Sequence, residues 1–362
     1  MNKVGIIIHI PHSSNNIPEF FYPCFYDLEK MQDNLLVMTD WYTDELFDCG
    51  FNDSIESIVH QYSRLICDVE RFLNPLDESM FAKGMGMYYT HSYDNTLLKK
   101  SPFVDLEGLS YYSLVLQIYQ KHHQLFLEKV NSFLEKYDNV IIVDAHSFSN
   151  EILPFEDVSS LERPDICIGT DYIYTSETLK NFSKEFFNKL GLSVEFDYPY
   201  SGTIVPAFYL KDENCNNHLY SIMIEINKEL YLQNNTNVKS FDFYRIKSMI
   251  NEFLYNLLNF NFDKSINCFD NADSNQKQLS KPDDNFSGYF KEIKDINYIM
   301  ENLNVNSIIN HVDYGRGTVT DVFHKMDDKN KFTITFDKNP YAPQTFYYDA
   351  IKQGKFSLVV RK

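Results

Sequence analysis

The chain has 362 residues, 44% of them hydrophobic, and a formal net charge of −18. At roughly 150 residues per domain this length predicts two or three domains, and so acidic a chain repels nucleic acid and anionic membranes, which disfavours both as partners. Because no apolar run approaches the ~20 residues of a membrane span, we expect no membrane segment and interpret the chain as cytoplasmic.

Apolar runs and amphipathic stretches alternate along the first 258 residues. Strand-like runs cover residues 4–10, 55–62, 139–143 and 220–226, and helical periodicity covers residues 33–48, 110–136, 176–190 and 240–258. Gly191 follows the third helical stretch as a C-capping residue would. Runs that are apolar on both faces belong to sheets covered by helices. The sequence therefore predicts an α/β fold with a mainly parallel or mixed central sheet flanked by helices.

The composition changes after residue 260. Residues 261–290 are rich in Asn, Asp, Ser, Lys and Gln and predict a polar linker. A helical pattern at 291–303 precedes several short strand-like runs, which are typical of a small SH3-like β-barrel. Residues 305–362 carry a net charge of +3, whereas the rest of the chain carries −21. We therefore expect one domain at 1–260, a linker at 261–290, and a short helix with a barrel at 291–362.

Reactive side chains stand at the ends of three expected strands: His12, His146 and Glu225. The carboxyl ends of strands in an open α/β sheet gather ligands at one edge. Two imidazoles and a carboxylate can hold a catalytic zinc ion, which lowers the pKa of bound water to about 7, and Glu225 is a candidate general base. Either histidine could equally be a hydrogen-bonded structural residue. His122 and His123 lie in a helical stretch with charged neighbours and are expected at the surface or rim.

The segment from Ser63 to Arg71 is a candidate for substrate binding. It sets Arg64 and Arg71 among apolar and acidic residues. The planar fork of an arginine suits a carboxylate, which lysine does not match. These arginines are therefore either a clamp for a substrate carboxylate or members of a structural ion-pair network with Asp68 or Glu70.

A tight turn is expected at residues 198–203, which include Pro199, Ser201 and Gly202. The backbone N–H groups of such a turn can face a ligand. Turns of this composition are common, so the segment has weight only together with the others.

The six cysteines have no near neighbours among themselves: Cys24, Cys49, Cys67, Cys167, Cys215 and Cys268. Their spacing suits neither a thiolate metal site nor a redox pair. In a chain of this length we expect reduced, mostly buried thiols.

Taken together, seven segments resemble the N-formylglutamate amidohydrolase family over roughly residues 5–260. In chain order they are residues 11–14, 40–46, 63–71, 84–90, 144–147, 199–202 and 225–231. That family is similar in fold to zinc carboxypeptidases. The resemblance implies cleavage of the amide bond of N-formyl-L-glutamate to formate and glutamate, with a small acidic N-acyl amino acid as the substrate.

The resemblance also implies a metal centre. A zinc ion would be held by His12, His146 and a carboxylate. Asp40 is the first choice for this third ligand, and Asp44 and Glu19 are the alternatives.

The remaining implied roles concern the base and the substrate. Glu225 would act as general base, and Arg64 and Arg71 would lie near the substrate carboxylates. The turn would contribute further substrate-binding residues: Tyr200, Ser201 and Gly202.

Two positions depart from the family's pattern. Glu70 stands where we expect Asn before Arg71, and Thr203 follows Gly202 where many members have a second glycine. Both positions lie in segments expected near the substrate. The resemblance therefore supports the amidohydrolase class more directly than it supports the formylglutamate substrate.

Residues 310–319 resemble the opening of the small Tudor-like barrels that are appended to helicases. Their glycines, Gly315 and Gly317, fit an ordinary tight β-turn equally well. The barrel is either an interaction module, with a partner that the sequence does not identify, or a purely structural unit.

Two alternative functions stay open at this point. One is a non-catalytic adaptor that binds protein or nucleic acid through the barrel, although the net charge of −18 disfavours nucleic acid. The other is an amidase that acts on a different acyl-amine or on a peptide. Metal content separates an adaptor from either enzyme, because an adaptor has no reason to retain zinc.

Overall fold

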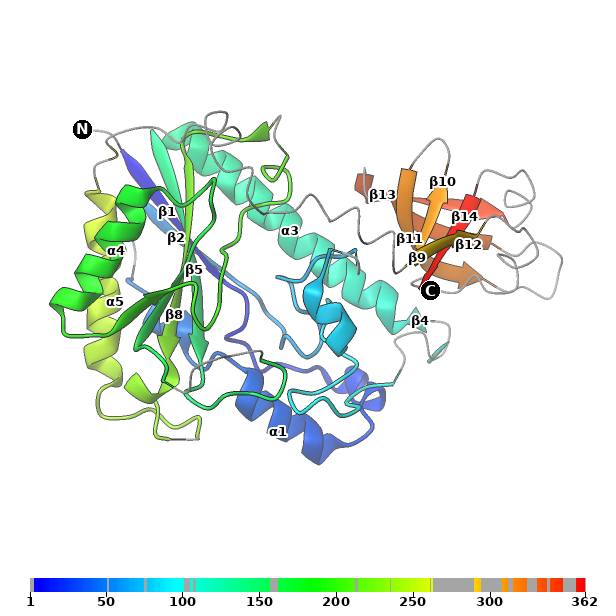
Figure 1. Cartoon of the computed structure of the whole chain (residues 1–362), viewed down its shortest axis with the longest axis horizontal. Coiled ribbons are helices and arrows are strands. Elements are labelled where there is room, and N and C mark those ends of the chain that lie inside the picture. The colour runs from blue at the N-terminus through cyan, green and yellow to red at the C-terminus, as the bar shows by residue number, and fades with distance from the viewer. Residues whose placement is uncertain are drawn as a thin grey trace. The chain divides into compact units, whose positions relative to one another are not determined.

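The computed structural model describes residues 3–50, 52–74, 77–100, 105–106, 109–156, 162–211, 214–234, 236–260, 262, 290–293, 308–311, 315–323, 331–336, 339–347 and 356–361. The chain divides into two compact units (Figure 1). The first comprises Met1–Arg71, Met80–Lys100 and Lys121–Ser274, and the second comprises Phe72–Ser79, Ser101–Gln120 and Asn275–Lys362.

A six-stranded mixed sheet forms the centre of the first unit. Its strands, in spatial order, are β2 (Ile55–Val59), β1 (Val4–Ile10), β5 (Asn139–Phe148), β8 (Leu219–Asn227), β6 (Ile166–Gly169) and β7 (Val194–Phe196). The first four run parallel to one another, and β6 and β7 run in the opposite direction. The expected α/β fold with a mixed sheet is confirmed.

Helices cover both faces of this sheet (Figure 1). Helix α3 (Tyr111–Lys136) packs on one face, and α4 (Glu177–Lys189) and α5 (Phe243–Leu258) pack on the other. The other two α-helices are α1 (Leu28–Met38) and α2 (Thr43–Leu46). Short 3-10 helices are η1 (Glu19–Cys24), η2 (Ser79–Lys83) and η4 (Lys228–Leu230), and β3 (Asp105–Leu106) pairs with β4 (Leu109–Ser110).

Alternation along the strands divides the core between the two faces. In β1, Ile6 and Ile8 pack in the cluster that contains α4 and α5 side chains. Ile7 and, from β5, Ile142 pack in the cluster that contains Phe126 of α3. Polar side chains that share the parity of Ile7 and Ile142 therefore point to the α3 side of the sheet.

The single helix expected at residues 33–48 is wrong. Helix α1 ends at Met38 and α2 begins at Thr43, and Tyr42 between them adopts a left-handed backbone with φ 63°. The apolar–polar pattern of the sequence continues through this break, so periodicity alone predicts one continuous helix. The break matters for the site, because Asp40 lies in it.

Six described strands form an antiparallel sheet in the second unit. In spatial order they are β13 (Asn339–Tyr347), β12 (Lys331–Phe336), β11 (Gly315–Phe323), β10 (Ile308–His311), β14 (Phe356–Arg361) and β9 (Phe290–Ile293). The helical pattern expected from residue 291 is wrong over residues 291–293, which belong to β9. Residues 263–289, most of the expected linker, and 294–307 lie outside the described residues.

Four cysteines are free thiols: Cys24, Cys49, Cys67 and Cys167. The expectation of reduced cysteines is wrong for Cys215, which is part of a disulfide. Within the described ranges, none of the helices combines the length and apolar character needed to cross a membrane.

Candidate active site

The register of the central sheet brings chemical groups from three strands to one face. His9 of β1 pairs with Asp144 of β5, and His146 of β5 pairs with Glu225 of β8. These residues share the parity of the apolar side chains that pack on α3. A shift of one residue in any pairing would send them to the opposite face.

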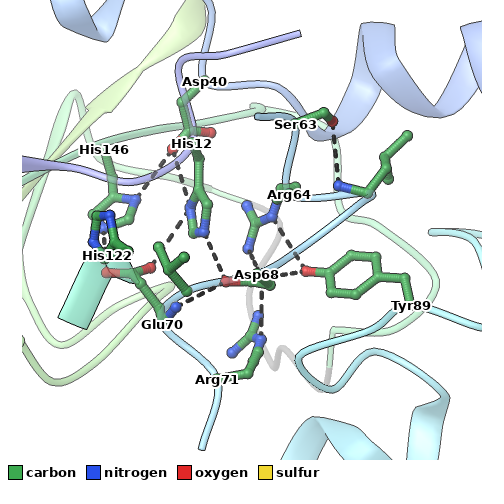
Figure 2. A network of polar contacts seen from close by, with 12 residues as sticks. His12, Asp40, Ser63, Arg64, Asp68, Glu70, Arg71, Tyr89, His122 and His146 are labelled. Carbon is green, nitrogen blue, oxygen red and sulfur yellow. Dashed lines mark hydrogen bonds and ion pairs between the residues drawn. The ribbon is translucent and has the colours of Figure 1, made fainter. Parts of the chain in front are cut away.

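Three donor atoms converge from His12, just after β1, from His146, near the end of β5, and from Asp40, between α1 and α2 (Figure 2). Oδ2 of Asp40 lies 3.1 Å from Nδ1 of His146 and 3.7 Å from Nδ1 of His12. All three side chains are at most 5% exposed. The structure thus brings together the two histidines and the carboxylate that the sequence suggested as a ligand set.

The outer nitrogen of His12 is held by Asp68. Nε2 of His12 lies 2.9 Å from Oδ1 of Asp68, which is fully buried. A proton on Nε2 that is donated to this carboxylate leaves the Nδ1 lone pair directed toward Asp40. A carboxylate that orients a ligating imidazole in this way is a common feature of metal sites.

The pKa values in the cluster show how strongly its members depend on one another. Burial alone would raise the pKa of Asp40, but hydrogen bonds and charge interactions with His12 and His146 hold that pKa well below its ordinary value. Burial alone would lower the pKa of His146, but Glu70 and Asp144 hold it well above its ordinary value. Asp40 is therefore ionised, and the charged form of His146 is favoured.

The residues present fit a divalent metal ion. Nδ1 of His12 is buried and has no hydrogen-bond partner in the described part of the chain. An unpaired buried acceptor is costly, and ligation would satisfy it. Two imidazoles and a carboxylate are also a donor set that catalytic zinc uses. The alternative third ligands, Asp44 and Glu19, are exposed and belong to none of the donor groups among the described residues.

Glu225 lies in the same cavity, which has a volume of about 170 Å³. Its side chain is 7% exposed, and burial raises its pKa to about 8, with Asp40 and Glu70 contributing in the same direction and His146 opposing them. A carboxyl group with a pKa near neutrality suits proton transfer at physiological pH.

Arg64 and Arg71 line this cavity and both contact one carboxylate. Oδ2 of Asp68 lies 2.9 Å from Nη2 of Arg64 and 3.3 Å from Nε of Arg71, and it also accepts a 2.6 Å hydrogen bond from the hydroxyl of Tyr89 (Figure 2). The ion-pair network that the spacing suggested is therefore present. The location of both guanidinium groups at the cavity also leaves them next to any bound ligand.

The turn at residues 198–203 reaches the cavity through Tyr200 and Ser201. The hydroxyl of Tyr200 donates a hydrogen bond to Glu156. Gly202 does not line the cavity; its φ of +91° favours glycine. Its carbonyl oxygen would lie only 2.1 Å from a Cβ on Gly169, so the turn packs tightly on β6.

Sequence reasoning did not place Glu70 between the two histidines, and it missed Lys228. Glu70 lies between His12 and His146, with Oε2 3.5 Å from the former and Oε1 3.0 Å from the latter. Lys228 is half-buried and donates hydrogen bonds to the carbonyl groups of Val37 and Thr39, which fixes the chain just before Asp40. The signal available for both was a charged residue next to a run of buried residues.

The expectation that His122 and His123 lie at the surface or rim is wrong. Their exposures are 7% and 8%. Nε2 of His122 lies 2.9 Å from Nε2 of His9, and Nε2 of His123 lies 2.7 Å from the carbonyl oxygen of Val69. Charged neighbours in the sequence did not reveal which side of α3 packs on the sheet.

Comparison with known proteins agrees with this architecture. The family model described as N-formylglutamate amidohydrolase matches residues 4–232. The chain is similar to the crystal structure of N-formylglutamate amidohydrolase from Ralstonia eutropha JMP134, with a TM-score of 0.59 and 17% identity over 72% of this chain and 94% of that one. It also aligns with a gene product of Agrobacterium tumefaciens, with a TM-score of 0.47 and 18% identity over 71% of this chain and 89% of that one.

Among curated proteins, none matches the chain. The family match spans more than half of the sequence and includes each of the histidines and carboxylates of the cavity. The chain belongs to the N-formylglutamate amidohydrolase family and is a hydrolase.

Proposed function

We propose that this chain hydrolyses N-formyl-L-glutamate to formate and glutamate, with one zinc ion bound by His12, Asp40 and His146. The observation that carries the proposal is the convergence of their three donor atoms, in which the buried Nδ1 of His12 has no hydrogen-bond partner among the described residues. When bound, a zinc ion supplies a Lewis acid that polarises a carbonyl group and acidifies water.

Glu225 is the proposed general base. Its strand position opposite His146 brings its carboxyl group into the same cavity as the donor atoms. As the carboxylate it can take the proton of the attacking water, and as the acid it can return that proton to the amine that leaves. A pKa near 8 without a bound cation falls when a cation is close, which favours the basic form at neutral pH.

Arg64 and Arg71 are proposed to bind the carboxylates of the substrate. Asp68 contacts both guanidinium groups and so holds them in position at the cavity. A guanidinium group carries five N–H donors in a fixed fork, which suits a carboxylate; Arg64 donates from Nη2 to Asp68 and from Nε to Tyr89. Tyr200 and Ser201 complete the proposed substrate-binding wall, with Gly202 shaping the turn behind them.

A second candidate substrate class is favoured by an adjoining cavity of about 250 Å³. Both cavities are lined by Val37, Ser149, Leu153 and Lys228. Trp41 and Leu232 add apolar surface to the second cavity. A larger acyl-amine or a short peptide would extend into this second cavity. With N-formylglutamate bound, water would fill the second cavity instead.

We also propose that residues 291–362 form an SH3-like unit separate from a catalytic domain at 1–260. The antiparallel order of β9 to β14 and the change of net charge from −21 to +3 support this division. The partner of such a unit is not identified by its charge alone.

The test of the proposed function is the release of formate by Glu225→Gln compared with the wild type. Glutamine keeps the shape of the side chain but cannot accept the proton, so kcat should fall by about 10²–10⁴-fold while bound metal is unchanged. The assay should include N-formyl-L-glutamate and an N-formyl dipeptide, and release of acetate should be measured in parallel for N-acetyl-L-glutamate. Unchanged activity in the variant would exclude the base role, and a preference for the dipeptide would favour the second substrate class.

A further inference from the structure

A second group of metal-type donors adjoins the proposed zinc site. Nδ1 of His9 lies 2.9 Å from Oδ1 of Asp144 and 3.9 Å from Oε1 of Glu70. Nε2 of His146 lies 3.2 Å from the same Asp144 oxygen and 3.0 Å from the same Glu70 oxygen. The four atoms form a closed ring, and the side chains of His9 and Asp144 are 0% and 3% exposed.

These spacings suit ligands of one ion. Two donors at about 2.1 Å from an ion, separated by an angle of about 90–110°, are about 3.0–3.4 Å apart. Among the three residues other than His146, the distance from His9 to Asp144 lies close to that range and the distance from His9 to Glu70 is longer. The ligand atoms of His9, Glu70 and Asp144 all lie within 4.8 Å of one another. His9, Asp144 and Glu70 thus have the composition and spacing of a separate divalent-cation site.

The second nitrogen of His9 has a partner of its own. Nε2 of His9 lies 2.9 Å from Nε2 of His122. His9 can donate the proton of Nε2 to His122, in the tautomer of His122 that leaves this nitrogen unprotonated. With its proton on Nε2, His9 directs the lone pair of Nδ1 at two carboxylates, an arrangement that a cation would stabilise.

The charge of the site points the same way. Five carboxylates, with Glu225 in its basic form, face two guanidinium groups and one ammonium group, which leaves a formal charge of −2 before any histidine is protonated: Asp40, Asp68, Glu70, Asp144 and Glu225 against Arg64, Arg71 and Lys228. One divalent ion only neutralises this charge. A dianionic substrate would then meet no net attraction, whereas a second divalent ion would supply it.

We propose that His9, Asp144 and Glu70 bind a second divalent cation. Glu70 belongs to both sites, because its Oε2 faces Nδ1 of His12 at 3.5 Å while its Oε1 faces the second group. The inference rests on the proposed function in that the second cation completes the charge of the same cavity.

The experiment counts bound ions on the full-length chain. The protein is stripped with a chelator, titrated with Zn²⁺, passed through a desalting column, and analysed for metal and protein. The same titration is run on four variants: His9→Gln, Asp144→Asn, His12→Ala and His123→Gln. Glutamine at residue 9 can still reach His122 from the Nε2 position but offers no ligand at Nδ1, and His123 is an equally buried histidine outside every donor group found among the described residues.

Two ions per chain are expected for the wild type and for His123→Gln, and one ion for His9→Gln, for Asp144→Asn and for His12→Ala. Circular dichroism shows which variants are folded, and the wild-type count is decisive even if one of them is not. A single ion that His12→Ala removes would refute the second site and leave the proposed function intact, with His9 and Asp144 as hydrogen-bonding support for His146. A second ion that persists in both His9→Gln and Asp144→Asn would also refute this assignment. No ion in the wild type would refute both proposals.

Discussion

Oδ1 of Asp68 lies 2.9 Å from Nε2 of His12, although 56 positions separate the two residues. The other oxygen of this carboxylate contacts Arg64 and Arg71. Asp68 therefore connects the proposed metal ligands with the proposed substrate-binding arginines. Its own pKa is well below the ordinary value, because His12 and the two arginines outweigh the effect of burial.

Replacing Asp68 by Asn should weaken metal binding by about 10–100-fold, the usual effect of losing a carboxylate behind a ligating histidine. Asparagine keeps the size of the side chain and one acceptor for His12 but removes the charge. Competition with a chromogenic chelator measures the affinity. Asp138→Asn is the control, because Asp138 is an exposed acceptor at the N-terminal end of β5. Equal affinities in wild type and Asp68→Asn would limit Asp68 to holding the arginines.

Replacing Arg64 or Arg71 by Lys should lower kcat/KM for N-formyl-L-glutamate by roughly tenfold to over a hundredfold. Charged hydrogen bonds contribute on the order of 1.5–3 kcal/mol each, and lysine cannot make the forked contact. The loss should be small for N-formyl-L-leucine, which lacks the side-chain carboxylate. Arg245→Lys, an exposed arginine paired with Asp242, is the control. If both substrates lose the same factor, the arginines only maintain the fold.

Lys99 should make the stability of the chain depend on pH. Burial lowers the pKa of Lys99 to about 7, and its ammonium group contacts the carbonyl of Leu65 and the ring of Tyr88. Between pH 7 and 10.5 the unfolded chain keeps a proton that the folded chain has lost, so the stability should rise with pH in this window, by about 1 kcal/mol per pH unit.

The variant Lys99→Met has no such proton. Its unfolding midpoint in urea should therefore gain less than that of the wild type as the pH rises from 7 to 10. Lys189→Met is the control, because that lysine side chain is 76% exposed. Parallel pH profiles for the wild type and Lys99→Met would show that Lys99 stays protonated in the folded chain.

Truncation tests the boundary of the catalytic unit. A chain that ends at Asp263 should remain folded and active on small substrates. A chain that ends at Asn259 should be less stable by about 1–2 kcal/mol for each lost aromatic side chain. Phe260 packs against Phe182, and the ring of Phe262 lies 4.1 Å from that of Tyr220. Thermal unfolding compares the two, and aggregation of the longer truncation would show that residues after 263 are needed for folding.

Much of the fold could be predicted from the sequence, because buried parallel strands are continuous apolar runs. The strands β1 and β8 and the helices α3, α4 and α5 follow the expected ranges within a few residues, whereas β5 continues five residues past its expected end at Val143. The strands β6 and β7 were missed, since four and three residues are too few for a periodic signal. The antiparallel direction of β6 depends on tertiary pairing, which no local pattern encodes.

The site could be predicted only in part. His12, His146 and Glu225 follow apolar strands, so their convergence could be inferred from the strand ends. Asp40 came from the resemblance, because a left-handed residue that interrupts a helical pattern is not visible in periodicity. The position of Glu70 between two histidines depends on a loop whose path the sequence does not reveal.

The central claim is that this chain is a metal-dependent hydrolase of N-formyl-L-glutamate, and formate release measures it most directly. The purified full-length chain is assayed as isolated, after removal of metal by a chelator, and after addition of Zn²⁺, with the double variant His12→Ala, His146→Ala in parallel. We predict formate release that disappears with the metal, returns with Zn²⁺, and is absent in the double variant under all three conditions. Formate release that is equal before and after metal removal, or full activity in the double variant, would contradict the account.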